Sequence, residues 1–210
     1  MSAALVVRWL GRVDYESTWQ AMIAFTATRT PQTPDEFWVC EHPPVFTLGL
    51  AGKASHLLAD IGIPLIKIDR GGQITYHGPG QVVVYLLLDL TRREIGIRDL
   101  VTRVEQAIID LLAEHRIAAR RLVGAPGVYV DQEGGKDGIA KIAALGLRVR
   151  RNGCYHGLSL NVDMDLSPFS AINPCGYAGM AVTQTSDLGI NLAPSEAAKL
   201  LVKHLAEQLE

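Results

Sequence analysis

Apolar residues recur along this chain of 210 residues with two spacings, and each spacing predicts a different kind of element. A repeat of three or four residues is typical of a helix that buries one face. This repeat follows Asp14, which we expect to cap a helix that ends at Thr30-Pro31. It returns over residues 98–116 and after Pro194, so the sequence predicts three amphipathic helices.

Short β-branched runs bounded by turn residues predict strands between these helices. The expected strands lie near residues 36–41, 45–48, 65–68, 82–88, 127–131, 138–149 and 154–162. Consecutive strands mixed with isolated helices are typical of the α+β class. The sequence therefore predicts a single α+β domain over residues 1–210, in which helices flank a mixed or antiparallel sheet.

The size and charge of the chain narrow the classes of function. Its length suffices for one domain with a substantial core. A net charge of −2 argues against a nucleic-acid binder driven by overall basicity. No apolar run approaches the roughly 20 residues that span a bilayer, and residues 1–8 lack the pattern of a signal peptide. We expect a cytoplasmic monomer that binds neither nucleic acid nor membrane.

The cysteines indicate a reducing compartment. Cys40, Cys154 and Cys175 form an odd set without the Cys-x-x-Cys spacing of redox or zinc sites. No cluster of His, Cys and Asp has the spacing of metal ligands either. We therefore expect reduced thiols, no disulfide framework, no metal and no cofactor.

Residues 70–81 read Arg-Gly-Gly-Gln-Ile-Thr-Tyr-His-Gly-Pro-Gly-Gln and form the most informative segment of the chain. Glycine carries no Cβ, so the backbone here can approach a ligand closely. A glycine-rich hairpin or bulge without chemistry would show the same spacing. The many polar side chains between two apolar runs favour a segment that contacts a ligand.

Cys175 lies between Pro174 and Gly176, in a segment with the composition of a loop. Buried structural cysteines usually lie within apolar strands or helices, as the surroundings of Cys40 predict, and Cys154 fits either role. A thiolate exchanges readily with a thioester, because the leaving group has a similar basicity. Cys175 is therefore the candidate nucleophile, with a structural thiol as the alternative.

Lys141 is the candidate base. In the predicted strand 138–149, alternation places it on one face with Ala143 and Leu145. An ammonium in an apolar row loses its proton more readily than one in water, and the amine can then accept a proton. The alternative is a lysine on a solvated edge, and Lys136 in the glycine-rich turn is the exposed rival.

The histidines have structural interpretations, because no carboxylate partner is evident near them in the sequence. His77 is interpreted as a polar wall of the site. His156 would pack in the core on one strand face with Leu158 and Leu160. His42, which precedes two prolines, would fix a turn.

Small residues and arginines each leave two interpretations open. Ala143, Ala144, Gly146, Gly157 and Ser159 would leave an open apolar slot, but close packing between strands selects small residues as well. Arginines cluster within residues 92–93, 120–121 and 148–151. Such runs are usually solvated faces, although a basic rim would also speed the docking of an acidic protein.

Five motifs of the chain resemble, in order, those of the lipoyl (octanoyl) transferases in the biotin/lipoate ligase-like superfamily. They are the turn Glu41–Gly49, the glycine-rich run Arg70–Gln81, the lysine motif Lys141–Gly146, the glycine contact His156–Leu158 and the cysteine loop Asn173–Tyr177. Together they cover roughly residues 38–188, so the chain is identified as a member of this family.

The resemblance implies a biotin/lipoate protein ligase-like fold and an acyltransferase. The octanoyl group would pass from octanoyl-acyl carrier protein through a thioester on Cys175 to a lysine of lipoyl domains, with Lys141 as the base. Acceptors would be the lipoyl domains of 2-oxoacid dehydrogenase complexes and the glycine cleavage H protein. The residues expected to hold the acyl chain are Arg70, Gly71, Gly72, Gln73, Ile74, Thr75, Tyr76, His77, Ala144, Leu145, Gly146, Gly157, Leu158 and Ser159.

Three rival functions fit parts of the same pattern. An ATP-dependent lipoate–protein ligase would share the fold but would not need the cysteine loop. A lipoyl-domain-binding module would not need both Cys175 and Lys141. A thioesterase would deliver the acyl group to water instead of a protein lysine.

Overall fold

The structure is a computed structural model that describes residues 5–133, 136–151, 153–177 and 179–210. Within these ranges, the side chains of Lys136 and Cys175 are not described. Gly134 and Gly135, which belong to the glycine-rich turn expected from the sequence, lie outside the described residues.

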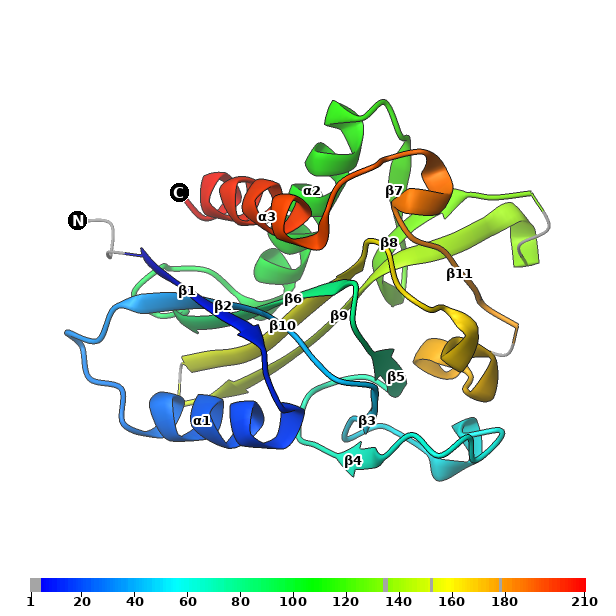
Figure 1. Ribbon diagram of the computed structural model, residues 1–210. Coiled ribbons are helices and arrows are strands. Elements are labelled where there is room, and N and C mark those ends of the chain that lie inside the picture. Colours follow the sequence, from blue (N-terminus) through cyan, green and yellow to red (C-terminus); the bar gives the residue numbers. More distant parts are fainter. Residues whose placement is uncertain (1–4, 134–135, 152, 178) are drawn as a thin grey trace.

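A large mixed sheet forms the centre of the molecule (Figure 1). Its strands, in spatial order, are β1 (Leu5–Arg12), β2 (Asp35–Glu41), β6 (Gln81–Asp89), β10 (Gly153–Asn161), β9 (Ile139–Arg150), β8 (Ala125–Asp131) and β7 (Ala119–Leu122). The short strand β11 (Ala181–Val182) also pairs with β9. Among the described residues of this sheet, the β1–β2 and β11–β9 pairs are parallel and the other pairs are antiparallel, so the prediction of a mixed sheet is confirmed.

Helices cover both faces of this sheet. Helices α2 (Ile97–Glu114) and α3 (Pro194–Leu209) pack on one face, and α1 (Tyr15–Ala27) packs on the other (Figure 1). Strand β6 supplies Val84, Leu86 and Leu88 to the first core and Val83, Tyr85 and Leu87 to the second. Burial on both faces explains why its sequence is continuously apolar.

A second sheet of three strands lies beside the first. Strand β3 (Val45–Leu48) is central, between β4 (Leu65–Lys67) and β5 (Ile74–His77). Its own small core includes Phe46, Tyr76 and Phe169. The glycine-rich run leaves this sheet and enters the large one, since β5 is followed directly by β6.

The alternative interpretation of the glycine-rich run, a hairpin between two buried strands, is wrong. The strands that flank it belong to different sheets, and β4 is only half-buried. Strands β1, β5, β7 and β11 were also absent from the prediction. They are short or mostly exposed, so their apolar pattern is weak, and pairing with distant strands stabilises them.

The predicted start of the first helix is confirmed. The Asp14 carboxylate accepts a hydrogen bond from the Ser17 backbone N–H at 2.9 Å, which satisfies a free donor of the first turn.

Candidate functional site

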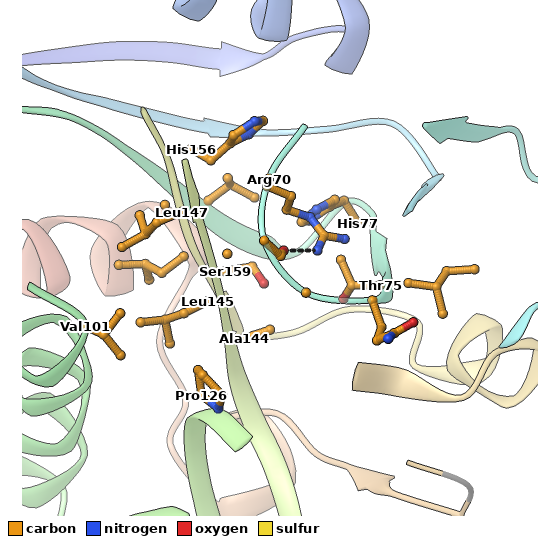
Figure 2. Close-up of a pocket in the computed structure, with 18 of the residues that line it drawn as sticks. Arg70, Thr75, His77, Val101, Pro126, Ala144, Leu145, Leu147, His156 and Ser159 are labelled. Carbon is orange, nitrogen blue, oxygen red and sulfur yellow. Dashed lines mark hydrogen bonds between the residues drawn. The ribbon is translucent and has the colours of Figure 1, made fainter. Parts of the chain in front are cut away.

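A cavity of about 330 Å³ lies where the glycine-rich run crosses strands β9 and β10. Figure 2 shows Arg70, His77 and His156 at one end and Val101 and Pro126 at the other. Ala144 and Ser159 lie on the side of the strands that faces Arg70, and Leu145 lies on the opposite side, beside Val101. The cavity therefore has a polar inner end, under α1, and an apolar outer end, beside α2.

The residues expected to hold an acyl chain converge on this cavity. The expected residues of segments 70–77, 144–146 and 157–159 all line it, with the exception of Tyr76. Tyr76 packs instead between Phe46 and Phe169 in the core of the smaller sheet. The role of Tyr76 in holding the acyl chain stays a prediction.

The floor of the cavity consists of small residues on one face of the large sheet. Ala144 pairs with Ser159, and Gly146 pairs with Gly157, across strands β9 and β10. Ala143 pairs with Leu160 and packs in the opposite core. The open-slot interpretation therefore holds for the paired residues of the floor, but not for Ala143.

Gly157 also satisfies the second interpretation, close packing of strands. A Cβ at this position would lie 1.9 Å from the backbone oxygen of Val84 on β6. Any larger residue would push β10 away from β6. The floor is thus flat because its residues are small. At Gly157 the close packing against β6 leaves room for glycine alone.

Arg70 fixes the path of the glycine-rich run. This buried side chain donates from Nη2 to the backbone oxygen of Thr47 at 2.8 Å and from Nη1 to the oxygen of Gly71 at 2.8 Å. The Gly71 N–H donates to the backbone oxygen of Leu147 at 3.0 Å. These bonds hold the run against both β3 and β9.

A second, smaller cavity is lined by residues of the floor, by the lysine and by the cysteine loop. Its volume is about 10 Å³, which is enough for about one water molecule. Thr75, Ala144 and Ser159 line both cavities, while Lys141 and Pro174 line only the smaller one. The structure therefore places the lysine, the backbone of the cysteine loop and one side of the main cavity around one small space.

Lys141 is buried, so the alternative of a solvated edge is wrong. Its Nζ donates to the backbone oxygen of Pro126 at 2.9 Å and lies 5.2 Å from the centre of the Tyr129 ring. Both partners belong to β8. A contact between an ammonium and a ring face is favourable, and the Pro126 carbonyl compensates part of the lost hydration.

The face on which Lys141 was predicted to lie requires a correction. The register between β8 and β9 shifts, because Val128 pairs with Ala143 while Tyr129 pairs with Lys141. The extra residue, Ile142, packs in the same core as Ala143. This β-bulge moves Lys141 onto the face of the cavity floor, away from the face that strict alternation predicts.

Cys175 lies in a short turn, η4 (Pro174–Gly176), that packs against β5. The turn is anchored through its backbone, because Asn173 N–H donates to the His56 oxygen at 2.9 Å and Gly176 N–H to the Asn173 oxygen at 2.9 Å. The structure thus describes where the backbone of Cys175 lies, beside the small cavity lined by Pro174.

The other two cysteines are buried in cores. Cys40 packs beside Trp38 and Tyr85, and Cys154 packs between β6 and α2. Burial raises the pKa of the Cys154 thiol to about 12 and raises that of Cys40 as well. Both thiols therefore stay protonated at neutral pH, which makes them structural residues.

The inner end of the cavity is a network of buried aromatic and imidazole groups. The His77 Nδ1–H donates to Gln81 Oε1 at 2.7 Å, and its ring stacks on Tyr15. Tyr85 Oη and His42 Nε2 are 2.6 Å apart. Burial, aided by the nearby His42, lowers the pKa of His77 to about 3. His77 is neutral, as its interpretation as a polar wall requires.

Asp69 is a site residue that the sequence interpretation missed. It accepts hydrogen bonds from Trp19 Nε1 at 2.8 Å, from His156 Nε2 at 3.0 Å and from the Tyr155 hydroxyl. Burial alone would raise the pKa of Asp69, but these donors outweigh it and hold the pKa well below its usual range. The expectation that His156 has no carboxylate partner is wrong, because the partner is distant in sequence.

His156 differs from its prediction in conformation as well. Its backbone has φ of 60°, so it does not continue the alternation of Leu158 and Leu160, and it lines the cavity. His42 does not merely fix a turn, since it is fully buried and its Nδ1 lies 2.7 Å from the backbone oxygen of Val13. Position next to a glycine-rich run was the only sequence signal for Asp69.

Two of the three arginine clusters serve the fold. Arg92 and Arg93 contact the buried carboxylate of Asp35 at 2.7 and 2.5 Å. Arg121 approaches Glu105 at 3.2 Å. Residues 148–151 are exposed at the end of β9 and stay available for a partner.

The described part of the chain has no helix long and apolar enough to cross a membrane. Over the same residues, no group of three or more His, Cys, Asp or Glu side chains is arranged to hold a metal ion.

Residues 14–206 match the model of the lipoyl protein ligase A/B catalytic domain family. The chain belongs to this family. Among its members, the octanoyltransferase of Dechloromonas aromatica is 66% identical over 206 residues, covering 98% of this chain and 97% of that protein. The octanoyltransferase of Laribacter hongkongensis is 62% identical, covering 97% and 95%. The chain is therefore an acyltransferase of the family.

Solved structures show the same fold. A bipartite lipoate protein ligase from Thermoplasma acidophilum has a TM-score of 0.73 at 16% identity and covers all of this chain, with 84% of its own length matched. A lipoate-protein ligase A bound with ATP has a TM-score of 0.70 at 17% identity, with 100% and 86% covered. The predicted α+β, biotin/lipoate protein ligase-like fold is confirmed.

Proposed function

We propose that this protein transfers an octanoyl group from octanoyl-acyl carrier protein to a lysine of a lipoyl domain, through a thioester on Cys175. The observation that carries the proposal is a pair of cavities that share Thr75, Ala144 and Ser159 in their linings. Small and apolar residues contribute to the lining of the larger cavity, and the smaller cavity is lined by Lys141 and by Pro174, next to Cys175 in sequence. The high identity to octanoyltransferases supports the same assignment.

The main cavity suits a medium-length alkyl chain. Leu145, Leu147 and Val101 offer apolar surface, and each methylene that leaves water contributes about 0.8 kcal/mol. Thr75 and Ser159 line both cavities. Their hydroxyls would contact the acyl carbonyl, which places the thioester beside Lys141.

In the first half-reaction, neutral Lys141 takes the proton of the Cys175 thiol. The thiolate attacks the carbonyl carbon of the carrier thioester, so a new C–S bond forms and the bond to the carrier sulfur breaks. The leaving thiolate receives the proton from the Lys141 ammonium. The products are octanoyl-Cys175, the free carrier thiol and neutral Lys141.

In the second half-reaction, the amine of the acceptor lysine attacks the same carbonyl carbon. Lys141 takes a proton from the attacking amine, the C–S bond to Cys175 breaks and an amide bond forms. Cys175 leaves as a thiolate beside the Lys141 ammonium. A proton then returns from the ammonium to the thiolate, which restores the neutral amine and thiol of the first half-reaction, so no proton is gained or lost overall.

The proposed acceptors are the lipoyl domains of 2-oxoacid dehydrogenase complexes and the glycine cleavage H protein. The enzyme would act in the cytoplasm, as a monomer of one catalytic domain. The reaction requires no cofactor, because the thioester already carries the activation energy. The exposed arginines of residues 148–151 would favour acidic partners.

Intact-mass analysis after incubation with octanoyl-acyl carrier protein, without ATP, tests the proposal. We expect an octanoyl adduct that hydroxylamine removes and that peptide mapping locates on Cys175. The buried thiols of Cys40 and Cys154 provide matched controls, since Cys40→Ala and Cys154→Ala should keep the adduct. An adduct that survives Cys175→Ala, or a strict need for ATP, would overturn the mechanism.

A further inference from the structure

One peptide group connects Lys141 with a carboxylate of helix α2. The carbonyl oxygen of Pro126 accepts the hydrogen bond from Lys141 Nζ at 2.9 Å. The N–H of the same peptide group, which belongs to Gly127, donates to Glu105 Oε1 at 2.9 Å. Because a peptide group is planar and rigid, the carboxylate that holds its N–H also sets the direction of its carbonyl oxygen.

Gly127 shows how tightly this peptide group packs against the lysine. Its φ is 140°, a conformation that other residues rarely adopt. A Cβ at Gly127 would lie 2.4 Å from Lys141 Cε and 2.9 Å from Nζ. The backbone thus passes directly along the lysine side chain, and a small rotation of the peptide group would displace Nζ.

Glu105 is buried on the face of α2 that contacts the sheet, where the neighbouring residues Val104 and Ile108 are apolar core residues. A carboxylate in this setting is costly unless it is paired. Arg121 Nε lies 3.2 Å from Oε2 as an ion pair without the alignment of a hydrogen bond. The Glu105 carboxylate therefore has two partners, the Gly127 N–H and Arg121, at a position that lies among apolar core residues.

We propose that Glu105 is a positioning residue that orients Lys141 through the Pro126–Gly127 peptide group. This inference rests on the proposed function, because it requires Lys141 to be the base. A charged acceptor at the N–H polarises the peptide group and strengthens the bond that its carbonyl makes to Nζ. The orientation of the Lys141 amine beside the small cavity therefore depends on the Glu105 carboxylate, through the hydrogen bond that this carboxylate accepts from the Gly127 N–H.

A double-mutant cycle tests this role. Transfer from octanoyl-acyl carrier protein to a lipoyl domain is measured for the wild type, Glu105→Ala, Lys141→Ala and the double variant. We expect Glu105→Ala to lower kcat by roughly 10- to 100-fold, as a misplaced group does, with KM changed less than about twofold. In the Lys141→Ala background the same change should cost less than about twofold, because the residue it positions is gone.

Two variants separate positioning from loss of structure. Glu105→Gln keeps the size and an oxygen acceptor, so kcat should fall only about fivefold, in line with the difference between charged and neutral hydrogen bonds. Asp110→Asn is a matched control on the same helix. The Asp110 carboxylate binds Gln106 and Gln208 and does not reach the β8 peptide group, so kcat should be unchanged.

Equal losses from Glu105→Ala in both backgrounds would show a merely structural role and overturn the inference, and so would an unchanged kcat. If Glu105→Ala fails to fold, the cycle with Glu105→Gln decides by the same criterion. An unchanged rate in Lys141→Ala alone would instead refute the proposed base. The two failures are therefore distinguishable.

Discussion

The two ends of the main cavity differ in polarity and in how far their surface is already covered. At the outer end, Val101 and Leu145 present apolar surface that is only partly covered. At the inner end, Tyr15, His77 and Tyr85 are buried, and their polar atoms bind one another or neighbouring side chains. Only at the outer end would a ligand gain binding free energy by covering exposed apolar surface.

The difference indicates how the cavity limits the length of its ligand. The paired polar groups of Tyr15, His77 and Tyr85 offer no new partner to an alkyl chain, and breaking their hydrogen bonds leaves buried groups unpaired. The inner end is therefore a wall, whereas the outer end is a binding surface. Substitutions at the wall should change the stability of the fold, and those at the outer end should change affinity.

The largest effect is expected at Gly157, where the two ends meet. Gly157→Ala would place a Cβ 1.9 Å from the Val84 oxygen, so the free energy of unfolding should fall by at least about 3 kcal/mol. Urea denaturation measures this change. Gly71→Ala is the matched control, since its nearest neighbour would be the Leu147 oxygen at 3.4 Å, an ordinary contact. Equal losses in both variants would contradict the packing argument.

At the wall, Tyr85→Phe removes the hydroxyl that lies 2.6 Å from His42 Nε2. The buried imidazole loses that partner, so the free energy of unfolding should fall by about 1–3 kcal/mol. Tyr177→Phe, at an exposed residue of the cavity lining, should change it by less than about 0.5 kcal/mol. If chemical denaturation gave the two variants the same stability, the inner network would not be stabilising.

The wall should also make stability depend on pH. The pKa of His77 is about 3 in the folded protein, against about 6.5 in an unfolded chain. The unfolded state therefore binds more protons below pH 6.5, and the stability present above that pH is lost as the pH falls toward 3.

His77 alone should contribute a slope of about 1.4 kcal/mol per pH unit between pH 6 and 4. His77→Gln should reduce the slope by that amount in unfolding curves recorded across this range. Val101→Ala should shift the curves without changing their slope. A slope that His77→Gln leaves intact would assign the pH dependence to other groups.

The smallest effect is expected at the outer end. Val101→Ala removes two methyl groups that would contact the acyl chain, so KM for a small octanoyl thioester should rise about fivefold. Tyr85→Phe should change this KM by less than about twofold. Steady-state kinetics of both variants decide the comparison, and the reverse order would show that the inner end binds the ligand.

Local patterns predicted the parts of the molecule that local forces determine. The cap at Asp14 and the helix around residues 98–116 follow from nearest neighbours along the chain. The wall of the cavity formed by His77 was also anticipated, because a polar run between apolar strands has few other uses. These features need no knowledge of which strands pair.

The parts that were missed depend on pairing between distant segments. The bulge at Ile142 leaves no mark in the sequence, yet it decides on which face Lys141 lies. Asp69 and His156 are 87 positions apart, so their hydrogen bond follows only from the fold. Strand β1 is an exposed edge whose alternation is weak, and its pairing with β2 stabilises it.

The pairing of β6 with β10 has a consequence for synthesis of the chain. The ribosome completes residues 70–89 long before residues 153–161, so the glycine-rich run and the apolar strand β6 emerge without their partner. Until β10 arrives, one edge of β6 is open and can pair with other chains. We expect truncated chains that end before Gly153 to aggregate. Such chains would lack the cavity floor, and Lys141 would have no defined position beside it.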